Sequence, residues 1–254
     1  MIRYSSSYWR DVAWQAYGNS LAQIVGIAGV PLLSRLYSPS DFAAQSLFIQ
    51  FVTFATAIVT WRYEFFVQLP KKSQEVHALN TIIVIIGLLS IASLTPLLFL
   101  FNESVATLLG NATVGKWLPL APLTAVLVSW GVASQNNAQR YGEYKNSGLS
   151  ELVGKLAYIS TALLAALSHV GTFGLIITTA IAAASKTGFL YLIRPVAKSS
   201  FVCLDSNTIS SVLLRFSKLA NSTVFSHLFT TLSVTLPHVA ISRQYGSDVL
   251  GQFA

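Results

Sequence analysis

Apolar stretches about as long as a membrane-spanning helix recur along the whole 254-residue chain, with short polar segments between them. A helix needs about 20 predominantly apolar residues to cross a hydrocarbon core of about 30 Å. The pattern predicts seven such segments, at residues 12–33, 42–61, 79–101, 117–138, 152–167, 174–193 and 219–241. The strict alternation of apolar and polar residues that barrel strands need is missing, so we expect all seven to be helices.

The expected fold class is therefore all-α, a polytopic transmembrane helix bundle. We expect a six-helix transmembrane lobe over residues 1–200 and the start of a second lobe over residues 201–254. Residues 248–254 are mostly apolar and resemble the beginning of an eighth helix, so we expect the chain to be a piece of a longer protein.

A weak internal repeat supports two related lobes. Ser34-Arg-Leu-Tyr37, followed by Asp41, comes after the first expected helix. Ser242-Arg-Gln-Tyr245, followed by Asp248, comes after the seventh. This is where a transporter of six plus six helices begins its second lobe.

Composition also indicates a lipid environment. Hydrophobic residues make up 53% of the chain and charged residues 10%, against roughly 25% charged in a soluble domain. The net charge of +7 comes from Lys and Arg in short clusters between apolar runs, so no nucleic-acid partner is expected. A single cysteine, Cys203, excludes an intramolecular disulfide and a cysteine-based metal cluster.

The distribution of Lys and Arg predicts the orientation in the membrane. If the N-terminus is cytoplasmic, that side holds Arg3, Arg10, Arg62, Lys71, Lys72, Arg140, Lys145, Lys155, Arg194, Lys198, Arg215 and Lys218. The other side holds Arg35, Lys116 and Arg243, and Lys186 falls within a helix. Because cytoplasmic loops carry the excess of basic residues, the N-terminus is predicted to be cytoplasmic.

Polar side chains share one face of several expected helices. Gln15, Asn19 and Gln23 recur every four residues in the first helix. They either line a substrate cavity or hydrogen-bond to a neighbouring helix, and the sequence leaves both readings open. Comparable stripes are Thr53, Thr56 and Thr60, ending at Arg62 and Glu64; Ser129, Ala133, Asn136 and Arg140, with Asn137 beside them; and His227, Thr231, Thr235, His238 and Ser242.

Some of these residues have ordinary structural alternatives. Arg62 and Glu64 suit snorkelling at the membrane interface. The two histidines suit interhelical hydrogen bonding as well as a cavity lining. Lys186 is the stronger candidate, because it sits in a helix about seven residues before Arg194 with no acid near it in sequence. An intramembrane cation indicates either a functional cavity or snorkelling.

Catalytic motifs are missing from the sequence. It has no P-loop, HExxH or GxSxG motif and no paired intramembrane carboxylates, so neither an enzyme nor a cofactor is expected. No acid occurs between Asp11 and Asp41 or between Asp205 and Asp248. The first and seventh helices therefore lack the buried carboxylate expected of an ion-coupled drug exporter.

Several motifs occur in an order that resembles one family. They are Pro31-Leu-Leu-Ser-Arg-Leu-Tyr-Ser-Pro39 with Asp41-Phe42, Arg62-Tyr-Glu64 with Leu69-Pro70, Arg140, Gly171-Thr-Phe-Gly-Leu-Ile176, and Leu236-Pro237 with Tyr245-Gly246 and Gly251. With these motifs the chain resembles the Wzx-type polysaccharide or O-antigen flippases. That family belongs to a superfamily shared with multidrug exporters and the lipid II flippase. Full members have two lobes, and this chain corresponds to the first lobe and the start of the second.

The resemblance implies transfer of an undecaprenyl-diphosphate-linked oligosaccharide across the bacterial inner membrane by alternating access, in the synthesis of O-antigen, capsule or exopolysaccharide. The partners it implies are the lipid-linked oligosaccharide, membrane lipids, a polysaccharide polymerase and a chain-length regulator. The candidate cations for the diphosphate are Arg35, Arg62, Arg140, Lys186 and Arg243. The candidates for the sugars are Gln15, Asn19, Gln23, Asn136 and Asn137, with Glu64, His227 and His238 as further candidates.

Three other classes remain open. An ion-coupled multidrug exporter of the same fold would need a buried acid in the cavity helices, which the sequence does not indicate. A membrane-embedded polymerase or glycosyltransferase would need catalytic acids or a large loop. A purely structural membrane subunit would need Lys186 and Arg140 for folding alone.

Overall fold

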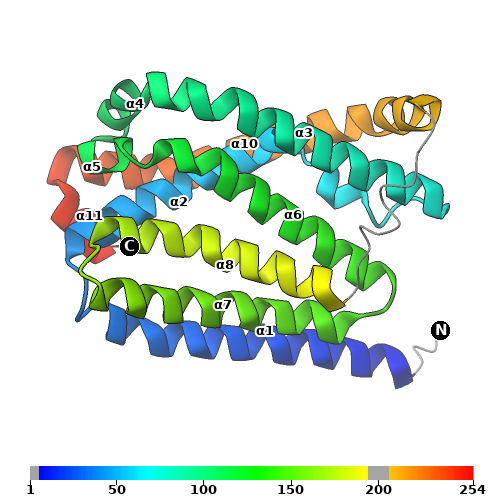
Figure 1. Cartoon of the computed structure of the whole chain (residues 1–254), viewed down its shortest axis with the longest axis horizontal. Coiled ribbons are helices and arrows are strands. Elements are labelled where there is room, and N and C mark those ends of the chain that lie inside the picture. The colour runs from blue at the N-terminus through cyan, green and yellow to red at the C-terminus, as the bar shows by residue number, and fades with distance from the viewer. Residues whose placement is uncertain (1–5, 194–205, 254) are drawn as a thin grey trace.

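In a computed structural model, the residues described, 6–193 and 206–253, form an all-α helix bundle and include no strand. Seven helices in this part of the chain are long and apolar enough to cross a membrane. They are α1 (Ser6–Leu33), α2 (Pro39–Val59), α3 (Ser73–Leu100), α6 (Ala121–Arg140), α7 (Tyr144–Leu167), α8 (Thr172–Ile193) and α10 (Ser206–Tyr245) (Figure 1). The prediction of a polytopic, multi-pass membrane protein is confirmed.

Shorter helical elements connect the long ones. They are η1 (Tyr63–Phe66), α4 (Asn102–Leu109), α5 (Ala112–Gly115), η2 (Leu118–Leu120) and α11 (Ser247–Phe253). The helix α11 lies where the sequence predicts the start of an eighth helix, and that it continues into one stays a prediction. Five residues named in the sequence analysis, Arg3, Arg194, Lys198, Cys203 and Asp205, lie outside the residues described.

The start of α7 differs from the prediction. The helix begins at Tyr144, not at residue 152, because its polar first turns pack within the bundle. There Gln139 Nε2 donates to Ser147 Oγ at 3.1 Å. Lys155 therefore lies about three turns inside a spanning helix. The predicted segment 152–167 also contained Lys155, near the end counted as cytoplasmic, and that orientation stays a prediction.

The helices run roughly side by side along the long axis of the molecule (Figure 1). The α1 helix packs chiefly against α7, and α7 also packs against α8. The α6 helix lies between α8 and the α2–α3 side, and α10 packs against α2 and α3. Since α10 contacts α2 and α3 of the expected first lobe, the division at residue 200 stays a prediction.

Close backbone approach joins α1 to α7. A Cβ added at Gly18 would lie 2.6 Å from Gly148 Cα, which is too short for any real contact. Because helices in lipid associate through van der Waals packing, small residues at such a crossing stabilise the pair. The position of the α1 wall therefore depends on Gly18 and Gly148.

Residues of the Pro31–Pro39 motif fix the start of α2. Ser38 and Asp41 form a capping box at its N-terminus. Asp41 also accepts a hydrogen bond from Thr172 at the start of α8, and the Tyr37 hydroxyl donates to the carbonyl of Ala162 in α7 at 2.7 Å. The motif thus ties α2 to α7 and α8 at one end of the bundle.

Candidate substrate cavity

A cavity of about 550 Å³ lies within the bundle, between α1, α6, α7 and α8. We call it the lysine cavity. It is lined by Asn19, Ala22, Gln23, Leu127, Val128, Gly131, Glu151, Gly154, Lys155, Tyr158, Thr179, Ala182, Ala183 and Lys186. All of these residues belong to helices long and apolar enough to span a membrane, so a polar ligand bound here would lie among such helices.

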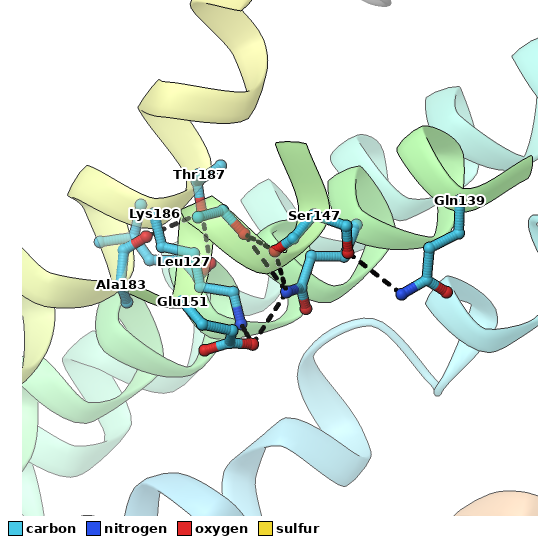
Figure 2. A network of polar contacts seen from close by, with 9 residues as sticks. Leu127, Gln139, Ser147, Glu151, Ala183, Lys186 and Thr187 are labelled. Atoms are coloured by element: carbon cyan, nitrogen blue, oxygen red, sulfur yellow. Dashed lines mark hydrogen bonds and ion pairs between the residues drawn. The ribbon is translucent and has the colours of Figure 1, made fainter. Parts of the chain in front are cut away.

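Glycines on two helices make room for Lys186. A Cβ added at Gly154 would lie 3.3 Å from Lys186 Cβ, and one at Gly131 would lie 3.9 Å from its Cδ. The aliphatic stem therefore passes between α6 and α7. Its ammonium nitrogen lies 2.6 Å from Glu151 Oε1, and Figure 2 marks this contact between α8 and α7 with a dashed line. Lys186 thus pairs with an acid on α7.

Glu151 was missed as the partner of Lys186 because the two residues are far apart in sequence. The same Oε1 atom accepts a hydrogen bond from Gln135 Nε2 at 2.8 Å. The neighbouring Thr187 hydroxyl donates to the carbonyl of Leu127 at 3.1 Å and holds α8 against α6 (Figure 2). The sequence indicated no buried acid in the cavity helices, and the acid that α7 brings to the lysine cavity, Glu151, has 37% of its side chain exposed.

Lys155 is a second cation on this cavity, one helical turn beyond Glu151. Its side chain covers Gly26 of α1. The ammonium lies 5.7 Å from the centre of the Tyr158 ring, a cation–π distance. Lys155 forms no ion pair with any described residue. It was not among the predicted site residues, because the predicted helix began at residue 152 and Lys155 was counted with the cytoplasmic basic residues.

The three amides of α1 lie at the same wall. Asn19 and Gln23 line the lysine cavity, whereas Gln15 lies at the α1–α7 contact beside Gly148. The side-chain oxygens of Gln15 and Asn19 are buried and have no hydrogen-bond partner among the described residues. The geometry therefore favours a lining role for Asn19 and Gln23 over interhelical bonding.

An adjoining cavity of about 810 Å³ continues toward the Pro31–Pro39 motif. We call it the threonine cavity, because Thr53, Thr56, Thr124 and Thr179 line it. The two cavities share Val128, Lys155, Tyr158 and Thr179. Gln45 on the threonine side donates to the Tyr158 hydroxyl at 2.8 Å. The bundle thus holds a lysine-rich compartment next to one rich in hydroxyls.

The turn after α2 holds Arg62 and Glu64 away from both cavities. Arg62 has a left-handed backbone, with φ of 60°, and its guanidinium lies 4.2 Å from the centre of the Phe65 ring. Glu64 is almost fully buried, with 1% of its side chain exposed, and lies 3.6 Å from Arg62. It accepts a hydrogen bond from Thr60 at 2.6 Å. This pair is packed inside the protein, which does not fit interfacial snorkelling.

Burial raises the pKa of Glu64, although the hydrogen bond from Thr60 and the charge of Arg62 act in the opposite direction. The folded state therefore holds the proton more tightly than the unfolded state. The contribution of Glu64 to the free energy of unfolding is therefore highest at low pH, and it falls as the pH rises through the raised pKa of Glu64.

We expect the melting temperature of Glu64→Gln to rise relative to that of wild type as the pH increases from 5 to 8, because glutamine cannot lose a proton. Thermal unfolding in detergent tests this, and parallel curves would contradict it.

The polar face of α6, the fourth spanning helix, also contacts the turn after α2. Asn136 Nδ2 donates to the carbonyl of Glu64 at 2.8 Å, and Arg140 donates to the carbonyl of Gln68 at 3.0 Å. Asn137 exchanges hydrogen bonds with Asn80 of α3, the shorter at 2.9 Å. None of Asn136, Asn137 and Arg140 lines either cavity. Their contacts are those of structural ties, and their substrate role stays a prediction.

The remaining candidates lie elsewhere. Arg35 is exposed in the turn after α1, and Arg243 donates to the carbonyl of Thr107 at 3.2 Å at the same end of the bundle. His227 Nε2 lies 3.3 Å from Thr56 Oγ1 in the α2–α10 contact. His238 lies further along α10, with Nδ1 2.9 Å from the carbonyl oxygen of Val234. The structure does not bring these four residues together with Lys186.

The charged residues lining the lysine cavity are Lys155, Lys186 and Glu151. One positive charge is therefore left without a counter-ion. Unpaired charge inside a membrane is costly, and an anion bound here would reduce that cost. Ammonium groups form strong, charge-assisted hydrogen bonds to phosphate oxygens, while the amides and hydroxyls nearby suit sugar hydroxyls. The arrangement fits a ligand with an anionic group and a polar, uncharged part.

Comparison with known proteins defines the family. Residues 32–254 match the family described as polysaccharide biosynthesis protein, so the chain belongs to that family. This agrees with the resemblance to polysaccharide flippases. The chain is similar to the succinoglycan biosynthesis transport protein ExoT of Rhizobium meliloti (strain 1021), with 23% identity over 248 residues. The match covers 96% of this chain and 48% of ExoT, so the chain spans about half the length of that relative. No solved structure matches significantly.

Proposed function

We propose that the chain forms part of a membrane transporter that moves a lipid-linked oligosaccharide between the two leaflets of the bacterial inner membrane. The observation that carries this proposal is the lysine cavity, whose cations and amides lie within spanning helices. A sugar diphosphate crossing hydrocarbon loses its hydration, which is very costly unless protein groups replace the water. Membership of a polysaccharide biosynthesis family supports this reading, as does the transport role in the name of ExoT.

In this proposal Lys155 and Lys186 bind the diphosphate, and Asn19 and Gln23 bind the first sugars. The threonine cavity receives the more distant sugars, and the lipid tail stays in the bilayer. The predicted cytoplasmic N-terminus places substrate entry at the end of the bundle where α7 begins. A polysaccharide polymerase and a chain-length regulator would act on the product. The protein itself would carry out transport and no covalent chemistry.

One observation favours a second candidate, an ion-coupled exporter of the same fold. Glu151 supplies a carboxylate in the lysine cavity, as such an exporter would need. That carboxylate is already neutralised by Lys186 at 2.6 Å, and Lys155 adds a further positive charge. A cationic drug would meet net repulsion here, so the anionic substrate is the better fit.

The test is deletion of the complete gene in its host, followed by assays of surface polysaccharide and of lipid-linked repeat units. We expect loss of the surface glycan, with repeat units accumulating on the cytoplasmic face of the inner membrane. Restoring the gene on a plasmid should reverse both effects. Repeat units that still reach the periplasm in the deletion strain would contradict the proposal and favour an exporter or a polymerase.

A further inference from the structure

Glu151 occupies the position on Lys186 that an anionic ligand would need. Its Oε1 atom lies 2.6 Å from the ammonium nitrogen, which is within the range of a strong charge-assisted hydrogen bond. The side chain of Lys186 is 20% exposed and that of Glu151 is 37% exposed. Both residues line the lysine cavity. The pair is therefore open to the cavity, unlike the buried Arg62–Glu64 pair.

The carboxylate is held from one side only. Lys186 and Gln135 both contact Oε1, and Oε2 makes no hydrogen bond to any described residue. Gln135 has other acceptors within reach, since its Nε2 also lies 3.3 Å from Ser150 Oγ. If the carboxylate turned away, the amide of Gln135 would keep a partner. Breaking the Lys186–Glu151 contact therefore leaves only the two charges without their partner, and a bound anion would give Lys186 a new one.

We propose that Glu151 is an internal competitor for the anionic substrate, pairing with Lys186 in the empty cavity and giving way when a diphosphate binds to Lys186 and Lys155. This inference rests on the proposed function and adds a specificity-determining residue to it. A diphosphate brings enough negative charge to neutralise both lysines after Glu151 has left. A ligand with one negative charge replaces the carboxylate with no electrostatic gain, and an uncharged lipid cannot displace it.

Two consequences follow for transport. The first is a minimum requirement for binding, because an anion must compensate the broken Lys186–Glu151 pair, and only a ligand that also pairs with Lys155 gains a second charge contact. The second is release, because re-formation of the Lys186–Glu151 pair offsets the loss of the bound anion when the substrate leaves. A cavity with two lysines and no competitor would bind diphosphate more tightly and release it more slowly.

The test measures ligand binding to the full-length protein in lipid nanodiscs, with farnesyl diphosphate as probe and farnesyl monophosphate and farnesol as comparison ligands. We expect Glu151→Gln to bind farnesyl diphosphate about tenfold more tightly than wild type, since the charge competition is gone. Binding of farnesyl monophosphate should tighten by about the same factor, because it must break the same Lys186–Glu151 pair, and that of farnesol should not change. Glu151→Asp keeps the charge and should stay close to wild type.

Two controls separate competition from a general effect of losing a glutamate. Glu75→Gln removes another ion-paired carboxylate, 3.2 Å from Arg215 and outside both cavities, and should leave affinity unchanged. In the double variant Lys186→Met with Glu151→Gln, the gain in affinity should disappear, because the competition acts through Lys186.

The outcomes distinguish this inference from the proposed function. If wild type and Glu151→Gln bind farnesyl diphosphate equally, the competitor role is overturned and the proposed function stands. Weaker binding by Glu151→Gln, or a gain that persists without Lys186, would also overturn it. If neither folded protein binds any of the phosphates, the proposed anionic substrate is contradicted, and the inference fails with it.

Discussion

Replacing both cavity lysines by methionine should abolish transport while leaving the protein in the membrane. Lys155→Met and Lys186→Met keep most of the side-chain length and apolar volume but remove the positive charges. Each charge-assisted hydrogen bond to a phosphate contributes about 1.5–3 kcal/mol. Loss of two should reduce transport by about a hundredfold or more. The measurement is the amount of surface polysaccharide in a deletion strain that carries each allele.

Controls decide whether such a loss comes from the site or from folding. Lys186→Met leaves Glu151 without its cation, so Glu151→Gln is added to remove the unpaired charge. Lys71→Met is the matched control, because Lys71 is exposed in the turn between α2 and α3 and lines neither cavity. Near-normal polysaccharide in the double-lysine variant, at equal membrane levels, would show that these lysines do not bind the substrate.

The second large effect is expected from adding one methyl group to α1. In Gly18→Ala the new Cβ would lie 2.6 Å from Gly148 Cα, so backbone must move to relieve the overlap. Overpacking of this kind typically costs about 1–3 kcal/mol. We expect a clear fall in melting temperature in detergent. Transport should fall as well, because α1 carries Asn19 and Gln23 on the cavity wall.

The matched control is Gly188→Ala in α8. A Cβ added at Gly188 meets nothing within 4 Å, and alanine favours a helix by about 1 kcal/mol relative to glycine. Its melting temperature should therefore match or exceed that of wild type. Equal stability of Gly18→Ala and Gly188→Ala would contradict the close contact between α1 and α7.

The spanning helices could be predicted from sequence because each one needs a long apolar run, whatever its neighbours are. The start of α7 could not, since residues 144–151 are mostly polar and become helical by packing against α6 and α8 within the bundle. For the same reason Lys155 was predicted near the start of its helix, whereas it lies about three turns inside α7. The count of basic residues therefore grouped it with the cytoplasmic residues and left it out of the candidate site.

The site could be predicted only in part. The four-residue spacing of Asn19 and Gln23 identified one wall of the lysine cavity, and the position of Lys186 within an apolar helix identified its cation. The pairing of Lys186 with Glu151 depends on how α7 and α8 pack, which no local pattern specifies. Asn136 and Arg140 share a polar face, and sequence alone cannot tell whether such a face lines a cavity or contacts another part of the protein. In the structure both residues donate hydrogen bonds to backbone carbonyls in the turn after α2.

The most direct test of the central proposal is transport by the purified full-length protein in proteoliposomes. The substrate would be a prenyl-diphosphate-linked oligosaccharide with a fluorescent label on the sugar, and a membrane-impermeant quencher would report the label's side. We predict that the protein transfers labelled headgroups between leaflets, and that protein lacking both cavity lysines does not. Equal rates in protein-free liposomes and in proteoliposomes would contradict the account.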